Sequence, residues 1–84
     1  MTRSTVVWDD TARDEVARLW LASGDKQAVT DAANRIDREL TIDPDIKGGI
    51  VRNQLRQLAV PPLTVLFLVS ESDRIVKVLA VKLI

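Results

Sequence analysis

The sequence predicts a single α+β domain over residues 1–84, with a helical hairpin packed on one face of a small, mainly antiparallel sheet. Three observations lead to this fold class. A short β-branched segment opens the chain, two segments then carry apolar residues every three or four positions, and two long apolar runs follow near the end. The predicted element order is therefore β-α-α-β-β-β, and a chain of 84 residues suits one domain.

The first strand and the first helix are read from residues 4–24. Residues 4–8 are β-branched and aromatic, which favours a strand, and Asp9 and Asp10 then supply the side chains that begin a helix. Gly24 is predicted to end this helix in the left-handed conformation. The helix carries one apolar stripe, in which we interpret Trp20 as a core residue. The stripe consists of Ala12, Val16, Leu19 and Trp20.

The second helix begins directly after the first. Asp25 is placed to cap it, and it must stop before Asp43-Pro44 because the residue before proline avoids the α-helical region. Such a short connection predicts an antiparallel pair of helices. The apolar stripe of this helix consists of Val29, Ala32, Ala33, Ile36 and Leu40.

The second half of the chain predicts three strands in a meander. A loop rich in turn residues comes first, and we interpret its Gly48-Gly49 pair as a turn because the lysine and hydroxyl residues of a phosphate-binding loop are missing. Strand one is expected to return and pair within the same sheet. The predicted strands cover about 51–60, which Pro61-Pro62 ends, then 63–69, and finally 74–84.

Both alternating sets of side chains in the last hairpin are apolar, although the two helices can cover only one face of the sheet. One set is Leu63, Val65, Phe67 and Val69 with Ile75, Leu79 and Val81. The other set is Leu66, Leu68, Val76, Val78 and Ala80. We therefore take Leu66, Leu68, Val76 and Val78 as partner-binding candidates, for a second copy of the chain or a wrapping partner segment. The alternative is that the sheet curves and loops cover this face.

Composition narrows the chemistry that the chain can perform. Cysteine, histidine and tyrosine are absent, which excludes disulfides, thiolate nucleophiles and any histidine base. We predict neither a metal site nor a cofactor. No apolar run approaches the roughly 18 residues of a membrane span, so we expect a cytoplasmic protein that makes no membrane contact.

The charge is unevenly spread although the net charge is +0. Six cations against ten anions give −4 in residues 1–46, and six cations against two anions give +4 in residues 47–84. The nucleic-acid-binding candidates in the basic half are Lys47, Arg52, Arg56 and Lys82. Arg52 and Arg56 are four residues apart, so a regular strand would place them on one face. The alternative is a solvated strand edge whose charges prevent aggregation.

The ordered set of segments resembles the RelE/ParE toxin superfamily over nearly the whole chain. The segments that carry the resemblance are 5–8, the two helices, Asp43-Pro44 before a glycine loop, 58–69 and 73–81. The resemblance implies a plasmid-stabilisation-type toxin of a type II toxin–antitoxin module. Such toxins cleave messenger RNA on the ribosome or inhibit DNA gyrase, and they bind a cognate antitoxin whose largely disordered segment wraps around them.

Two departures bear on activity. RelE-like nucleases usually carry an arginine in the third strand, where this chain has Thr64, and a tyrosine or histidine near the C-terminus, where this chain ends at Lys82-Leu83-Ile84. The resemblance implies a ribosome-dependent mRNA endoribonuclease, but these departures leave its catalytic residues unassigned. The alternative is a non-toxic, catalytically disarmed module that dimerises or binds a partner through its sheet.

Overall fold

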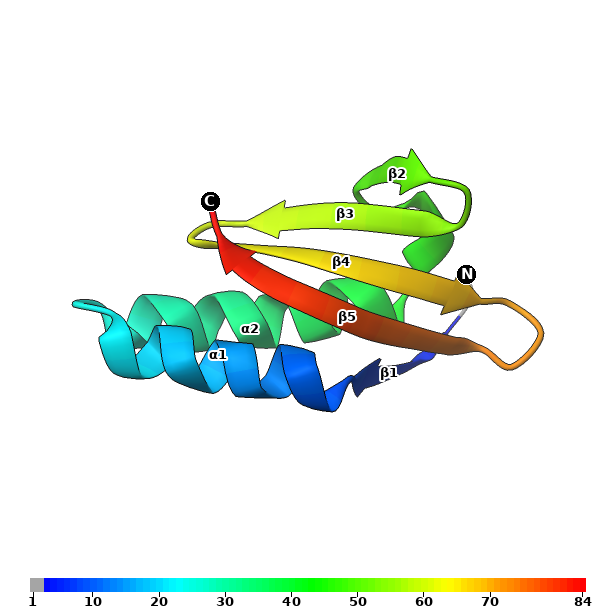
Figure 1. The fold of residues 1–84 in the computed structure, drawn as a ribbon. Coiled ribbons are helices and arrows are strands. Elements are labelled where there is room, and N and C mark those ends of the chain that lie inside the picture. The colour runs from blue at the N-terminus through cyan, green and yellow to red at the C-terminus, as the bar shows by residue number, and fades with distance from the viewer. Residues whose placement is uncertain (1–2) are drawn as a thin grey trace.

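The computed structural model describes residues 3–84, so Met1 and Thr2 of the predicted 1–84 domain lie outside the described residues. A five-stranded sheet forms one layer, and two helices lie side by side against one of its faces (Figure 1). The elements are β1 (Thr5–Trp8), α1 (Asp10–Ala22), α2 (Lys26–Thr41), the short 3-10 helix η1 (Pro44–Ile46), β2 (Gly49–Arg52), β3 (Leu55–Val60), β4 (Leu63–Ser70) and β5 (Ile75–Leu83).

The strand order in the sheet is β1-β5-β4-β3-β2. β1 pairs with β5 in parallel, while the other three pairs are antiparallel. The returning first strand and the mainly antiparallel sheet of the predicted α+β fold are thus confirmed. The helical hairpin between β1 and the meander makes the crossover that a parallel pair requires.

The ends of the helices follow local chemistry, with two corrections. Asp9 occupies the N-cap position of α1, but its side chain makes no capping hydrogen bond. The side chain of Asp25 accepts a hydrogen bond from the backbone N–H of Ala28 at 3.0 Å, so it caps α2 as predicted. The prediction that Gly24 is left-handed is wrong. α1 ends at Ala22, and its C-cap residue, Ser23, has an extended conformation. The Lys26 ammonium donates to the carbonyls of Leu21 and Ser23, so the end of α1 needs no glycine to satisfy these groups.

The predicted strand over residues 51–60 is divided into a hairpin of β2 and β3. Asn53 adopts a φ of 53° in the turn, a conformation that asparagine tolerates better than most residues. Before this hairpin, Gly48 has a φ of 62°, and a side chain there would collide with the carbonyl oxygen of Gln57. Gly48 is therefore required for β2 to lie beside β3.

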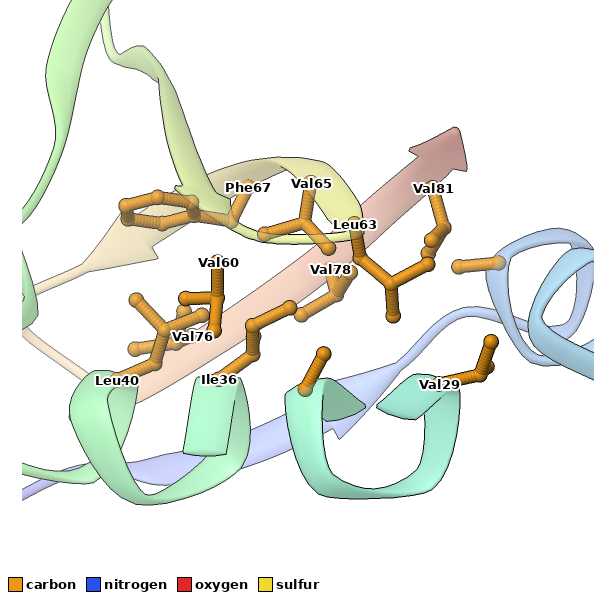
Figure 2. Packing of buried hydrophobic residues seen from close by; sticks show 12 residues of the cluster. Val29, Ile36, Leu40, Val60, Leu63, Val65, Phe67, Val76, Val78 and Val81 are labelled. Carbon is orange, nitrogen blue, oxygen red and sulfur yellow. The ribbon is translucent and has the colours of Figure 1, made fainter. Parts of the chain in front are cut away.

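One apolar core lies between the helices and the sheet. The stripe of α2 contributes its largest share, and it packs against side chains from β3, β4 and β5 (Figure 2). The buried members are Ala12, Val29, Ala32, Ile36, Leu40, Val60, Leu63, Val65, Phe67, Val76, Val78 and Val81.

The predicted division of β5 between the two faces is wrong. Phe67 is opposite Val78, whereas the preceding residue of β4, Leu66, is opposite Ala80, so Leu79 is an extra residue that bulges from β5. Val76 and Val78 precede the bulge and lie opposite Val69 and Phe67, so they lie in the core, where Figure 2 shows them facing α2. After the bulge, Val81 and not Ala80 points to the same face.

We predict that Ile36→Ala lowers the free energy of unfolding by about 2–5 kcal/mol, because Ile36 is fully buried and its loss leaves a cavity between α2 and the sheet. Urea unfolding monitored by circular dichroism measures the change. The neighbouring Arg35 is exposed, and Arg35→Ala should change stability by less than about 0.5 kcal/mol. Equal losses in the two variants would contradict this account of the core.

Candidate partner-binding surface

The face of the sheet that points away from the helices is here called the outer face. Cross-strand pairs share a face, so the register assigns its members from each strand. They are Thr5, Val7, Gly49, Arg52, Leu55, Gln57, Ala59, Thr64, Leu66, Leu68, Ser70, Ile75, Lys77, Ala80 and Lys82. No helix covers this face in the described part of the chain (Figure 1).

One row of side chains crosses all five strands of the outer face. In strand order it runs Val7, Lys77, Leu68, Leu55 and Arg52. Val7 is 41% exposed and Leu68 is 37% exposed, while Leu55 is half-buried. The row is an apolar strip with one cation, Arg52, beyond Leu55 and another, Lys77, between Leu68 and Val7. Such a strip is suited to bind apolar side chains of another protein.

The four partner-binding candidates divide between the two faces. Leu66 and Leu68 lie on the outer face, where a partner can reach them. Val76 and Val78 are fully buried beneath the helices and do not belong to this surface. Leu55, which is opposite Leu68, belongs to the outer face instead; local sequence does not predict this, because the face of Leu55 depends on the turn at Asn53.

Lys47 holds the end of α2 and does not project into a nucleic-acid site. Its ammonium donates to the carbonyl oxygens of Glu39 and Ile42, each at 3.0 Å, and lies 3.4 Å from the Glu39 carboxylate. These are the last carbonyls of the helix, which have no partner within it. A lysine at this end also complements the helix dipole.

Arg56 also donates hydrogen bonds to backbone carbonyls, in this case in the loop before β2. Its Nε donates to the Lys47 carbonyl at 3.0 Å, and its Nη2 donates to the Gly48 carbonyl at 3.4 Å. Arg56 therefore fastens β3 to the loop before β2. Lys47 and Arg56 together join the end of α2 to the β2–β3 hairpin through backbone carbonyls.

The remaining two nucleic-acid candidates are exposed but far apart. Arg52 lies on β2 and Lys82 on β5, with β3 and β4 between them. Three strand spacings amount to roughly 14 Å. The predicted common face of Arg52 and Arg56 is wrong as well, because the turn at Asn53 places them on different strands. The four candidates do not converge on one phosphate-sized site.

An apolar hollow lies between α1 and α2, with a cavity volume of about 630 Å³. Trp20 lines it and is 39% exposed, which corrects its assignment to the core. Its indole N–H donates to the Thr30 hydroxyl at 3.1 Å, and the Lys26 ammonium lies 5.2 Å from the ring centroid. Trp8 lines the other end of the hollow, and its indole donates to Asp37 at 3.1 Å.

Comparison with solved structures identifies the fold. The chain is 17% identical to a chain of the RelBE2 toxin–antitoxin complex from Mycobacterium tuberculosis, with a TM-score of 0.82, covering 100% of this chain and 94% of that one. For the chromosomal ParDE system of P. aeruginosa the identity is 15% and the TM-score 0.76, covering 98% and 97%. For the intact E. coli RelBE complex the values are 14% and 0.70, with 96% of each chain covered.

The chain has the RelE/ParE toxin fold. The resemblance seen in the sequence is thereby confirmed at the level of the fold, although no protein-family profile and no curated protein matches the sequence. Within this RelE/ParE fold, the strand position at which nucleases are expected to carry arginine is Thr64 of β4. Thr64 is 5% exposed and lies opposite Lys82, so this position offers no cation of its own.

Metal-binding clusters and membrane-spanning helices are both absent from residues 3–84. No group of three or more carboxylates lies close enough to hold a metal ion there. No helix in that range is long and apolar enough to cross a membrane.

We predict that Lys47→Met lowers the free energy of unfolding by about 1–3 kcal/mol, because methionine keeps the apolar stem but leaves two helix carbonyls without their charged donor. Arg52→Met is the matched control, since Arg52 is exposed and should change stability by less than about 0.5 kcal/mol. Urea unfolding of both variants provides the measurement. An unchanged Lys47→Met protein would show that its ammonium is available for another role.

Proposed function

We propose that this protein is the toxin-like component of a type II toxin–antitoxin module and binds a cognate antitoxin. The observation that carries the proposal is the outer face, which no helix covers within residues 3–84 and on which Val7, Leu68 and Ile75 are exposed. The fold supports it, because the chains of similar fold come from toxin–antitoxin complexes. An antitoxin segment lying on this face would bury Leu55, Leu66 and Leu68.

If the protein is toxic, it acts in the cytoplasm on translation or on DNA gyrase. Arg52, Lys77 and Lys82 are the cations of the outer face and would be the groups that contact a ribosomal or nucleic-acid target. Cleavage of messenger RNA would also need a proton acceptor and cations around one phosphate. Lys47 and Arg56 donate to backbone carbonyls instead. This favours binding of a target over cleavage of messenger RNA.

A second candidate function is a catalytically disarmed interaction module without toxicity. The specific observation in its favour is Thr64, a nearly buried neutral residue where an arginine is expected. This module would dimerise or bind a partner through its sheet, so the two candidates differ in what the unbound protein does to the cell. Growth of the host therefore separates them, while binding tests both.

We predict that co-expression with the adjacent reading frame yields a stable complex that purifies together, and that Leu68→Glu weakens it at least tenfold by placing a charge in the apolar strip. Isothermal titration calorimetry measures the affinity. The matched control is Ile46→Glu, because Ile46 is 70% exposed on η1 and is not part of the outer face.

Growth after tightly controlled induction of the 84-residue chain is measured in parallel. Rapid arrest that the partner reverses would establish a toxin, and normal growth with folded protein would establish the disarmed module. A chain that folds but forms no complex with the product of the adjacent frame would overturn the proposed function.

A further inference from the structure

We infer that the hollow between α1 and α2 binds a free amino acid with a large apolar side chain, whose carboxylate pairs with Arg13 and whose ammonium pairs with Asp37. This hollow is separate from the outer face, because the two helices lie against the other face of the sheet (Figure 1). The inference does not depend on the proposed function, which concerns a protein partner on the sheet.

One hydrogen bond shows how the two helices are aligned. The Trp20 indole donates to the Thr30 hydroxyl at 3.1 Å, so these residues lie at the same level of the helical hairpin. Arg13 precedes Trp20 by seven residues and Asp37 follows Thr30 by seven, which is almost two helical turns. Arg13 and Asp37 therefore face each other across the hollow, roughly 10 Å from the Trp20–Thr30 level, and both line it.

The space between these two levels is apolar. Its walls include Val16 and Ala17 of α1 and Ala33 of α2, where the small alanine side chains leave room for a ligand. Trp8 lies at the charged end and donates to Asp37 at 3.1 Å, so both tryptophans of the chain line the hollow. The cavity volume of about 630 Å³ suits a small molecule, because such sites combine apolar and aromatic walls with few polar groups.

Arg13 and Asp37 have opposite charges but do not pair with each other. Within residues 3–84 neither makes an ion pair, and the Arg13 guanidinium has no hydrogen-bond partner. Opposite charges that face one hollow without meeting favour a ligand that carries both charges, since each charge then gains a charge-assisted hydrogen bond. An α-amino acid carries a carboxylate and an ammonium on one carbon. Its side chain can then extend along the apolar walls toward Trp20.

A ligand with a single charge fits this hollow less well. A fatty acid would pair with Arg13 but would bring its carboxylate near Asp37, and an alkylamine would pair with Asp37 but bring its ammonium near Arg13. Like charges in close proximity oppose binding. The pair of charges therefore selects the head group, while the apolar walls select the side chain.

The first experiment compares three ligands that share one aromatic side chain. The probes are L-phenylalanine, phenethylamine, which lacks the carboxylate, and hydrocinnamate, which lacks the ammonium. Calorimetry measures the affinities for the full 84-residue chain. Tryptophan fluorescence provides a second readout, because Trp8 and Trp20 line the hollow and no probe contains an indole. We expect L-phenylalanine to bind at least tenfold more tightly than either single-charge probe.

The second experiment removes the cation. Arg13→Gln should weaken L-phenylalanine binding to about the level of phenethylamine, while phenethylamine binding changes by less than about threefold. A merely structural role of Arg13 would weaken both probes alike. The matched control is Arg35→Gln, because Arg35 is exposed on α2 outside the hollow, and it should change neither affinity.

A third experiment fills the hollow. Ala17→Phe should abolish binding of all three probes, whereas Ala22→Phe should not, because Ala22 is exposed on the same helix outside the hollow. Circular dichroism checks that both variants are folded.

Equal binding of the three probes would overturn the inference, as would absence of L-phenylalanine binding to the folded, unchanged chain. Self-association, or a complex with the product of the adjacent reading frame, that only Ala17→Phe abolishes would overturn it too and assign the hollow to that protein. The proposed function stands or falls separately, on whether the unchanged chain forms that complex and Leu68→Glu weakens it.

Discussion

The structure depends on how β5 is paired. This strand lies between β1 and β4, so within residues 3–84 it carries the only parallel pair of the sheet and one of the antiparallel pairs. The bulge at Leu79 changes the alternation midway along the strand. As a result Val76, Val78 and Val81 all point to the helices, although regular alternation would send Val81 to the opposite face from the other two. The bulge therefore lets both ends of β5 contribute to the core, and it turns Ala80 and Lys82 to the outer face.

The basic residues of the second half divide into two groups with different physical roles. Lys47 and Arg56 donate to backbone carbonyls and hold the end of α2 to the β2–β3 hairpin. Arg52 and Lys82 lie on the exposed strands with no such partner in the described residues. The positive net charge of this half of the chain therefore does not by itself indicate a nucleic-acid-binding site, because Lys47 and Arg56 stabilise the fold.

The outer face links this arrangement to function. It presents leucines between cations on a surface that the helical hairpin leaves uncovered. In a toxin of the RelE/ParE fold, such a surface would be covered when the antitoxin is bound and exposed when it is free. Among the described residues its register members include no aromatic residue, and Thr64 is the neutral residue opposite Lys82.

The sequence by itself determined the features that depend on neighbours along the chain. The α2 stripe of Val29, Ala32, Ile36 and Leu40, the Asp25 cap and the helix end before Asp43-Pro44 follow from local spacing and backbone preferences. These sufficed for the element order and the α+β fold.

Only the tertiary structure decided which strand side chains face the core. The bulge at Leu79 and the turn at Asn53 depend on the register with another strand, which the local pattern does not encode when both faces are apolar. A shift of one residue moves every following side chain to the other face. Val76 and Val78 lie in the core because they are opposite Val69 and Phe67, and Leu55 lies on the outer face because it is opposite Leu68. Cross-strand pairing and not local sequence therefore sets the face of each residue.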